Sequence, residues 1–522
     1  MSAEYGALFG VGVAAGISVA AGAQLLVNGL AKAYARNHAH DDDYYDDGAD
    51  EAAADVAVAA PRKASKAAAV LSPLVPADAD ERLLDTFARL DGLLTVSSSA
   101  LHQIVVSMAS EFRRGLAKDG RSLKMIPSFV TSLPSGQEID SVLALDLGGS
   151  NFRVCQVQLQ GHGRVRTTQR KYTVPDRLKE GTGTELFDFF ADCVAEFVRE
   201  HPPAGGSDGH TLGFTFSFPV QQTSINHGTL MHWSKGFTAS GVVGVDVVTL
   251  LQQAFERKKV KVNVTALVND TVGTLVAHAY TNPQTYVGVI LGTGTNAAYM
   301  ERLSEVPKWA GGKDGNMIIN TEWGAYDAPA LPITEFDQAL DRASANPKMQ
   351  IFEKLISGMY LGEIVRIILT SLVASGELFG GRTSPDLNRP YHFETAYMSR
   401  IERDHSLELA DTMNLFTDLL GISWSTLDDR RIVKHVCQLV GLRAARLSAA
   451  GIAAIVTKIN CLDGCTVAID GSLFEQYPHF QSRMRDALYE ILGINADNII
   501  LEQARDGSGQ GAALIALLHR NE

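Results

Sequence analysis

The sequence predicts an α/β protein built from two related halves. In LALDLGGSNFRV, residues 143–154, an apolar strand ends at a double glycine, and residues 155–160 then alternate between apolar and polar types, as a strand does. YVGVILGTGTNAAYMER, residues 286–302, repeats this strand–turn–strand arrangement. Because the two stretches share the same pattern and end in a hydroxyl residue followed by asparagine, they indicate an internal structural repeat.

Length, hydrophobic content, net charge and cysteine count limit which classes of protein this chain can belong to. At 522 residues the chain is long enough for two or three domains, and its 46% hydrophobic content can fill large cores. A net charge of −13 argues against a nucleic-acid partner, which requires a basic footprint. The five cysteines are too few and too irregularly spaced for a disulfide framework, so a reducing compartment is expected.

The first 80 residues differ from the rest of the chain. Residues 5–31 carry no charge and exceed the roughly 20 residues needed to cross a bilayer. Their hydrophobicity is modest, so a membrane anchor and a disordered or weakly helical tail both stay open. Residues 41–51, DDDYYDDGADE, predict a solvated acidic linker. We expect a cytoplasmic protein, either free or attached through residues 5–31 to a membrane such as the mitochondrial outer membrane.

Two helices are expected next, over residues 81–118, and Ser97–Ser99 would cap the second. The double glycine that follows lies in a hairpin. This excludes two familiar phosphate-binding loops, since both the P-loop and the dinucleotide fingerprint open a helix. Glycines instead expose backbone N–H groups, and hydroxyls add donors. Two such turns facing each other could hold a triphosphate from both sides.

Asp270 lies where a strand passes into a helix, in VKVNVTALVNDTVGTLVAHAY, residues 260–280. One interpretation is a helix N-cap, a common function of aspartate. The other is a carboxylate base for a hydroxyl nucleophile, because phosphoryl transfer commonly uses one aspartate to accept that proton. The helix dipole would favour the ionised carboxylate.

Further polar residues could bind a sugar. Gln350 and Glu353 are three residues apart and are expected on one helix face. Other side chains that can bind hydroxyls occur at or after strand-like stretches, namely Ser217, Asn269, Asn296 and Glu322, and the donor Lys235 follows Trp233 and Ser234. Near the C-terminus, Gly471–Ser472 and Gly507–Ser508 precede apparent helices, and such amide-rich helix starts can receive a nucleotide group.

These stretches together resemble the hexokinases, particularly fungal hexokinases and glucokinases. LALDLGGSNFRV and LGTGTNAAY resemble the two phosphate motifs of that family, FTFSFP with WSKGF its sugar signature, LVNDTVGT the segment with the base, and DGSGQGAALIAL the adenosine motif. The resemblance runs from about residue 85 to the C-terminus. It implies the two-lobed actin-like ATPase fold, with a large domain over 81–140 and 269–503 and a small domain over 141–268 and 504–522.

The resemblance also implies functions for individual residues. Asp270 would be the general base toward the 6-hydroxyl of a hexose, and Arg153 would offset charge on the phosphate. Sugar contacts would come from Ser217, Ser234, Lys235, Asn269, Asp270, Asn296, Glu322, Gln350 and Glu353. ATP contacts would come from Asp146, Gly148, Gly149, Ser150, Asn151, Arg153, Lys171, Thr293, Gly294, Thr295, Gly471, Ser472 and Ser508. Mg²⁺ would bridge the phosphates mostly through water, with Asp146 near its hydration shell.

The implied activity is ATP-dependent phosphorylation of glucose and related hexoses, the first step of glycolysis. Ser150 and Ser234 stand where the family usually has threonine, so each keeps the hydroxyl and loses a methyl group. Two alternatives stay open: a non-catalytic sugar sensor with the same fold, and a kinase for another sugar. The sequence leaves hexose preference undecided, and it does not distinguish a monomer from a homodimer.

Overall fold

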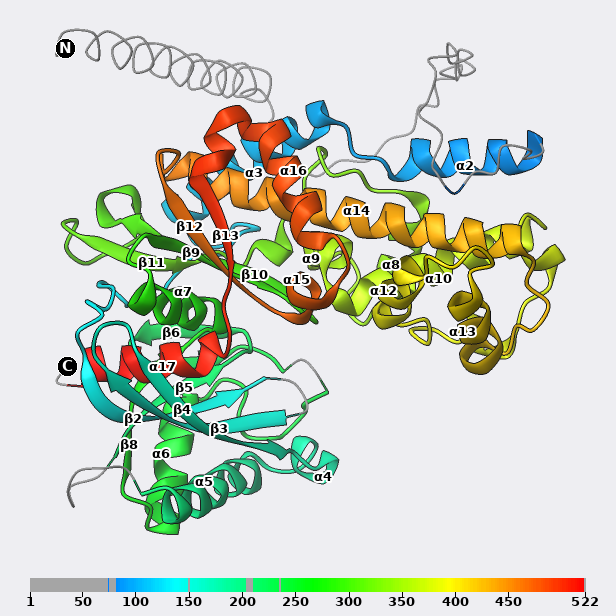
Figure 1. Ribbon diagram of the computed structural model, residues 1–522. Coiled ribbons are helices and arrows are strands. Elements are labelled where there is room, and N and C mark those ends of the chain that lie inside the picture. Colours follow the sequence, from blue (N-terminus) through cyan, green and yellow to red (C-terminus); the bar gives the residue numbers. More distant parts are fainter. Residues whose placement is uncertain (1–73, 75–80, 149–150, 203–209, 234–235, 521–522) are drawn as a thin grey trace, which may run out of the picture.

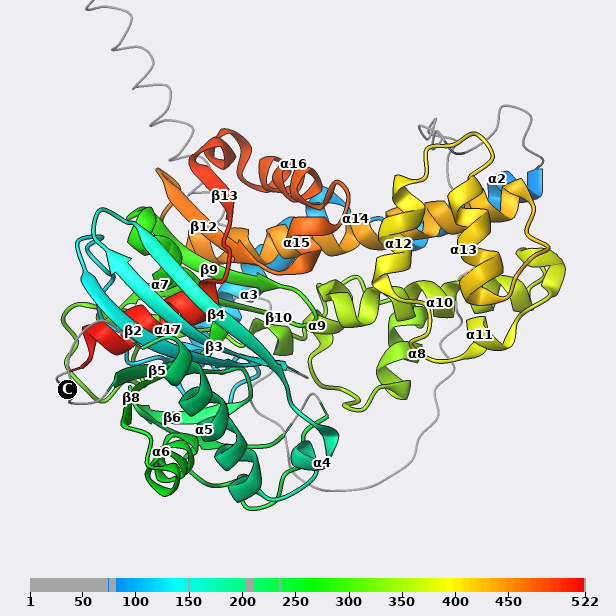
Figure 2. The same ribbon diagram turned by 60° about the horizontal axis from the view of Figure 1, so that its bottom comes forward.

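A computed structural model of the protein describes residue 74 and residues 81–148, 151–202, 210–233 and 236–520 (Figure 1). The predicted apolar segment 5–31 and the acidic linker 41–51 lie outside these residues. Two mixed sheets form the framework, and a pair of helices lies between them (Figures 1 and 2).

The first sheet has five strands in the order β4-β3-β2-β5-β8. Their bounds are β2 (Ile139–Leu147), β3 (Asn151–Gln160), β4 (Val165–Thr173), β5 (His210–Phe216) and β8 (Val262–Val268). β2, β3 and β4 are antiparallel neighbours, whereas β5 and β8 run parallel to β2. Leu147 pairs with Phe152 across β2 and β3, which confirms the predicted hairpin around the double glycine.

The second sheet has six strands in the order β1-β11-β10-β9-β12-β13. Their bounds are β1 (Ile126–Pro127), β9 (Thr285–Leu291), β10 (Thr295–Arg302), β11 (Asn316–Asn320), β12 (Cys465–Asp470) and β13 (Ile499–Gln503). β9, β10 and β11 are antiparallel neighbours, and β12 and β13 run parallel to β9. β9 to β13 therefore repeat the topology of β2, β3, β4, β5 and β8, which confirms the predicted internal repeat.

The helix that follows the last strand of each sheet packs between the two sheets. These helices are α7 (Asp270–Thr281), after β8, and α17 (Gly507–Leu518), after β13. α17 packs on β2 and β5, while α7 packs on β9 and against α17. Glycines permit the close approach, because a Cβ added at Gly511 would lie 1.9 Å from the Gly273 carbonyl oxygen.

A helical layer covers the second sheet around α14 (Leu427–Lys458) (Figure 1). It includes the two predicted helices, α2 (Glu81–Leu94) and α3 (Ser98–Ala117), and Ser97 caps α3 by accepting a bond from the N–H of Ala100. The other members are α8 (Glu335–Ala343), α9 (Ile351–Ile356), α10 (Gly358–Ala374), α11 (Pro385–Asn388), α12 (Thr395–Arg403), α13 (Ala410–Leu420), α15 (Ser472–Gln476) and α16 (Phe480–Leu492).

The first sheet carries α5 (Gly183–Glu200) and α6 (Val247–Lys258), which pack together over its other face (Figure 2). Smaller elements complete this part: α4 (Asp176–Lys179), β6 (Val220–Ser224) and β7 (His227–Leu230). The strands of the first sheet come from residues 139–268 and those of the second from 126–127 and 285–503. The domain boundaries given above stay a prediction.

Among the described residues, two helical segments, Glu81–Ala117 and α14, are long and apolar enough to cross a membrane. The most apolar part of α14 is 89% buried within the fold, as expected for a core helix. Length and composition alone are therefore weak support for membrane insertion here.

Candidate active site

The first glycine turn joins β2 to β3. Gly148 faces open space, since a Cβ added there would meet no atom within 4 Å. The predicted ATP residues Gly149 and Ser150 lie outside the described residues, and Asn151 begins β3. The backbone at Gly148 is thus accessible to a ligand, as the prediction requires.

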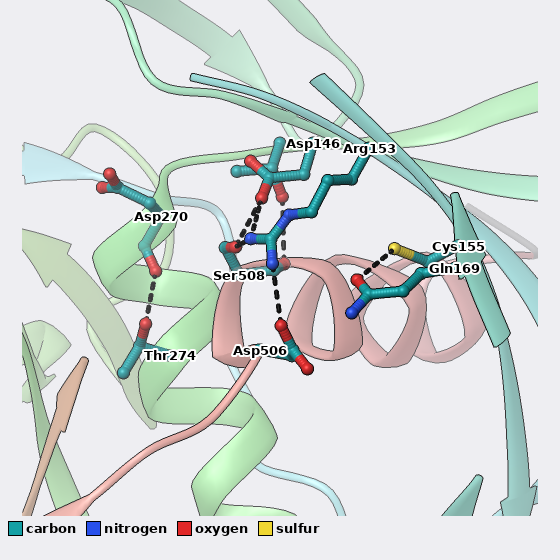
Figure 3. Close-up of polar contacts among 9 residues, drawn as sticks. Asp146, Arg153, Cys155, Gln169, Asp270, Thr274, Asp506 and Ser508 are labelled. Carbon is teal, nitrogen blue, oxygen red and sulfur yellow. Dashed lines mark hydrogen bonds and ion pairs between the residues drawn. The ribbon is translucent and has the colours of Figure 1, made fainter. Parts of the chain in front are cut away.

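A charged cluster stands beside this turn (Figure 3). Arg153 donates to Asp146 Oδ2 at 2.5 Å and to Asp506 Oδ1 at 2.7 Å. Ser508, in the first turn of α17, donates its hydroxyl to the same Asp146 oxygen at 2.8 Å. The cluster therefore connects β2, β3 and the start of α17, and three of its members are predicted ATP residues.

Asp506 is a member of this cluster that sequence reasoning missed. It precedes α17 in a left-handed conformation, with a φ of 51°. Burial opposes the charge of Arg153, but the carboxylate of Asp146 outweighs it, so the pKa of Arg153 is raised. The guanidinium is therefore a permanent positive charge beside the first glycine turn.

The second glycine turn joins β9 to β10 over Gly292–Thr295. Thr293 is exposed, whereas Thr295 is buried. The backbone N–H of Thr295 donates to Glu353 Oε2 at 3.0 Å, and its hydroxyl donates to the Ile290 carbonyl oxygen at 2.9 Å. A predicted phosphate residue thus contacts a predicted sugar residue directly.

Next to this turn lies a cavity of about 330 Å³, within the usual range of roughly 300–1,000 Å³ for small-molecule sites. Its walls come from the second glycine turn, the start of α10, one side of α12, and α15 with the residue after it, and include Gly292, Thr293, Met359, Ser472 and Tyr477. Gly471 has a φ of 127°, and a Cβ there would lie 2.3 Å from the Leu291 carbonyl oxygen. Only glycine fits this junction between β12 and the second turn.

Asp470, the last residue of β12, also escaped sequence reasoning. It pairs with Ile290 of β9, beside the second turn. Burial raises the pKa of Asp470 to about 6, and the carboxylates of Asp270 and Asp506 add to the rise while Arg153 opposes it. The charges of both halves of the site therefore act on one carboxyl group.

Asp270 is the first residue of α7 and is partly buried. The helix N-cap is its neighbour Asn269, whose side chain accepts a bond from the N–H of Thr271 at 3.0 Å. The N-cap interpretation of Asp270 is therefore wrong, although its own Oδ1 also accepts from that N–H, at 2.9 Å. Figure 3 places Asp270 on α7, across from the Arg153 cluster at the start of α17.

Asn296 and Glu322 meet through Asn320, which was not predicted. Asn296 Nδ2 donates to Asn320 Oδ1 at 2.8 Å and to Glu322 Oε1 at 3.3 Å. Asn320 Nδ2 donates to the same Glu322 oxygen at 2.8 Å. Glu322 adopts a left-handed conformation with a φ of 55°, which ordinary residues hold only where their surroundings fix them.

Gln350 and Glu353 do not share a helix face as predicted. α9 begins at Ile351, and Gln350 precedes it in a left-handed conformation with a φ of 55°. The two side chains nevertheless converge. A Cβ added at Gly324 would lie 2.6 Å from Gln350 Oε1 and 3.2 Å from Glu353 Cβ.

Ser217, Asn269 and Lys171 are the remaining predicted residues that the structure describes. The N–H of Ser217 donates to the Leu147 carbonyl oxygen at 3.1 Å, which ties it to the end of β2. A small cavity of about 30 Å³ borders Phe218, Asn269 and Glu322. Lys171 is exposed, and it lies opposite Arg153 in the antiparallel register of β3 and β4. Ser234 and Lys235 lie outside the described residues.

Comparison with known proteins identifies the family. Two sequence profiles described as hexokinase match residues 86–280 and 286–518. Hexokinase-2 of Oryza sativa subsp. japonica is 46% identical over 438 residues, which cover 80% of this chain and 88% of the relative. A hexokinase of Kluyveromyces lactis is 43% identical over 455 residues, covering 85% and 93%. The chain belongs to the hexokinase family.

Solved structures agree with this assignment. A Schistosoma mansoni hexokinase complexed with glucose is 40% identical, with a TM-score of 0.76 over 83% of this chain and 99% of that one. Another hexokinase crystal structure is 33% identical, with a TM-score of 0.74 over 84% and 100%. The predicted two-lobed actin-like ATPase fold is confirmed. Plant and yeast hexokinases match at similar identity, so the resemblance is not confined to fungal enzymes.

Proposed function

We propose that this hexokinase transfers the γ-phosphoryl group of ATP to the 6-hydroxyl of glucose or a related hexose, giving the hexose 6-phosphate and ADP. Family membership supports this activity over the alternative of a non-catalytic sugar sensor. One observation of the site carries the proposal. Asp270, at the start of α7, lies across from the cluster of Arg153, Asp146 and Ser508 at the start of α17 (Figure 3), so the proposed base and the phosphate-side arginine belong to one site.

Asp270 would act as the general base. The 6-hydroxyl proton passes to its carboxylate as the oxygen forms a bond to the γ-phosphorus, and the bond from that phosphorus to the ADP oxygen breaks. Its place as first residue of α7 puts it at the positive end of a helix dipole, which favours a carboxylate. Asn269, directly before it, is held by its cap bond and would bind a sugar hydroxyl.

The sugar would bind between the two glycine turns. Asn296, Glu322, Gln350 and Glu353 supply amide and carboxylate groups from three separate segments, and the bonds through Asn320 hold Asn296 and Glu322 in place. Ser217 adds a hydroxyl from the other half of the molecule. Such a ring of acceptors and amides suits a ligand with several hydroxyls. The Schistosoma mansoni relative was solved with glucose, which supports a hexose as the ligand.

ATP would place its phosphates at the two glycine turns and its adenosine in the cavity beside Met359 and Ser472. The start of α17, at Ser508, directs backbone N–H groups and a positive dipole end to the same region. Arg153 would offset charge that develops on the phosphate.

Mg²⁺ fits this site as a companion of ATP. Oxygen ligands suit it, and the carboxylates of Asp146 and Asp506 lie together at the Arg153 cluster beside the first glycine turn. Within the part of the chain that the structure describes, no group of three or more acidic, histidine or cysteine residues could hold a metal by itself. The ion would therefore be held mostly by phosphate oxygens and water, with Asp146 nearby, and would supply positive charge to the phosphate oxygens.

The test is Asp270→Ala in a coupled assay for ADP release with glucose. We expect a loss of roughly 10³-fold or more in kcat with sugar binding retained. Asp246→Ala is the matched control, because Asp246 caps α6 away from the site and its loss should leave kcat nearly unchanged. Turnover retained in Asp270→Ala would refute the base assignment. Wild-type protein that binds glucose without turning over MgATP would support the sensor instead.

The sugar itself is identified by a panel of glucose, fructose, mannose and N-acetylglucosamine with MgATP. Phosphorylation of the hexoses supports the proposal. A strict preference for N-acetylglucosamine would instead identify an amino-sugar kinase. Relative kcat/KM values across the panel also establish the hexose preference that the sequence leaves undecided.

Membrane attachment through residues 5–31 is a separate proposal, based on the uncharged run alone. Fractionation of full-length protein against a chain beginning near residue 80 tests it. Recovery of only the full-length chain with membranes supports the anchor, and equal solubility of both refutes it. The molar mass of the shorter chain in solution distinguishes a monomer from a homodimer.

A further inference from the structure

Trp323 connects the two parts of the site that the proposed function assigns to different substrates. We call residues 320–323 the sugar turn and residues 292–295 the phosphate turn. Trp323 belongs to the sugar turn by its backbone, directly after Glu322. Its indole is fully buried, and its Nε1–H donates to Thr295 Oγ1, in the phosphate turn, at 3.0 Å.

The indole is held firmly in this position. Phe352 of α9 packs edge-on against it, with ring centroids 5.8 Å apart and an interplanar angle of 81°. Gly451 of α14 also lies against the ring, since a Cβ added there would be 2.9 Å from the ring atom Cζ3. The ring therefore cannot shift without displacing a buried helix, and the direction of its N–H is fixed.

Thr295 is fixed in turn by three hydrogen bonds. Its hydroxyl donates to the Ile290 carbonyl oxygen and accepts from Trp323, while its N–H donates to Glu353. The hydroxyl proton of Thr295 is thus donated to the Ile290 carbonyl oxygen, and the indole N–H donates to the hydroxyl oxygen. Removing the indole N–H would leave a buried acceptor short of its donor at the end of the phosphate turn.

The sugar turn has anchors of its own that do not use the indole. The N–H and the hydroxyl of Thr321 both donate to the Ala297 carbonyl oxygen, at 2.9 and 2.8 Å. The N–H of Trp323 donates to Thr321 Oγ1 at 3.2 Å, and Asn320 holds Glu322. Loss of the indole N–H should therefore disturb the phosphate turn and leave the sugar turn in place.

We propose that Trp323 is a positioning residue that holds the phosphate turn in place from the sugar turn, so that the ATP phosphates are presented correctly to a bound sugar. This proposal rests on the proposed function, because it assumes that residues 292–295 receive ATP. The indole acts through Thr295 and touches neither substrate.

The test is Trp323→Phe, which removes the N–H and keeps an aromatic ring. We expect kcat/KM for ATP to fall by about fivefold to twentyfold, as for the loss of one buried hydrogen bond at a functional group. The dissociation constant of glucose, measured without nucleotide, should change less than about twofold, because the anchors of the sugar turn remain and the backbone N–H of Thr295 still holds Glu353.

Matched variants separate positioning from general destabilisation. Tyr299→Phe removes a buried hydroxyl bond from β10, to Glu301 at 2.7 Å, far along the strand from the phosphate turn, and should leave both constants unchanged. Thr295→Val should reproduce the ATP defect, and Thr295→Ser, which keeps the hydroxyl, should show a clearly smaller defect than Thr295→Val. The double variant Trp323→Phe with Thr295→Val should be no worse than the worse single variant, because both remove the same interaction.

Several outcomes would overturn the proposal. One is a normal kcat/KM for ATP in Trp323→Phe, and another is a rise in the glucose dissociation constant equal to the loss for ATP. If Trp323→Phe does not fold, the comparison of Thr295→Val with Thr295→Ser still decides, since equal kinetics in the two would refute positioning through the hydroxyl. Failure of the proposed function is recognised separately, by a wild-type protein without hexose phosphorylation.

Discussion

Arg153→Gln should destabilise the fold as well as impair catalysis, because it leaves a buried carboxylate without its cation. Asp146 is 7% exposed, and its Oδ2 accepts bonds from Arg153 at 2.5 Å and from Ser508 at 2.8 Å. In Arg153→Gln this oxygen of Asp146 keeps the hydrogen bond from the Ser508 hydroxyl and loses the bond from the guanidinium. Removing one partner of a buried pair typically costs about 3–5 kcal/mol, and the partial exposure of Arg153 places our expectation near about 3 kcal/mol.

The assay is urea unfolding of the substrate-free protein, compared with Arg170→Gln. Arg170 lies on the neighbouring strand β4 and pairs with the half-exposed Glu196 and Glu200, so its loss should leave the unfolding midpoint nearly unchanged. Adding Asp146→Asn to Arg153→Gln removes the stranded charge and should recover most of the stability without recovering turnover. Equal midpoints for Arg153→Gln and Arg170→Gln, or no recovery in the double variant, would refute this reasoning.

Two further predictions concern titratable groups. The pKa of Asp470 is about 6 in the folded protein against an ordinary value of 3.8, so the folded chain binds this proton more tightly; stability should fall as pH rises from about 4 to 6, by about 3 kcal/mol. Asp470→Asn should therefore raise the unfolding midpoint at pH 7.5 but not near pH 4, and an equal effect at both pH values would contradict the assignment. The neighbouring thiol of Cys465 lowers the pKa of Cys461, so iodoacetamide should modify Cys461 in the native protein faster than the buried Cys155. Cys465→Ala should slow that reaction at pH 7.5, and an unchanged rate would exclude Cys465 as the cause of the lowered pKa.

Local sequence pattern was sufficient to predict both hairpins and the start of α3. Alternation of apolar and polar residues after each glycine turn fixes a strand, and the serine before α3 supplies the cap oxygen within the same few residues. The internal repeat followed because the two turns carry the same residue types. These features depend on neighbours in the chain, which a sequence displays directly.

Features set by distant contacts were not predictable in this way. Gln350 and Glu353 were expected on one helix face, but α9 begins only at Ile351 and ends before Ser357, where α10 starts afresh. There the N–H groups of Gly358 and Met359 donate to the carbonyl oxygens of Gly292 and Thr293, at 2.8 and 3.1 Å. Bonds to the phosphate turn, 65 or more residues earlier in the chain, replace helical ones.

The same limit explains the missed site residues. Asn320 and Asp506 become part of the site through bonds to Asn296 and Arg153, and nothing in their immediate sequence distinguishes them from other turn residues. Asp470 ends β12, the strand equivalent to β5, after which Ser217 was predicted, so its position in the repeat was an unused signal. A comparison of equivalent strands in the two halves would have identified Asp470 as a candidate site residue.

That equivalence also explains how one repeated unit gives two different functions in the site. Each sheet contains one glycine turn, and its last strand is followed by a helix that starts at the candidate active site. α7 starts with Asp270 and α17 with Gly507 and Ser508. Both helix starts have positive dipole ends, which favour a carboxylate in one case and a phosphate group in the other. The residue type at each helix start therefore decides whether that helix provides the proposed proton acceptor or the proposed phosphate site. The shared backbone geometry places the two helix starts close together.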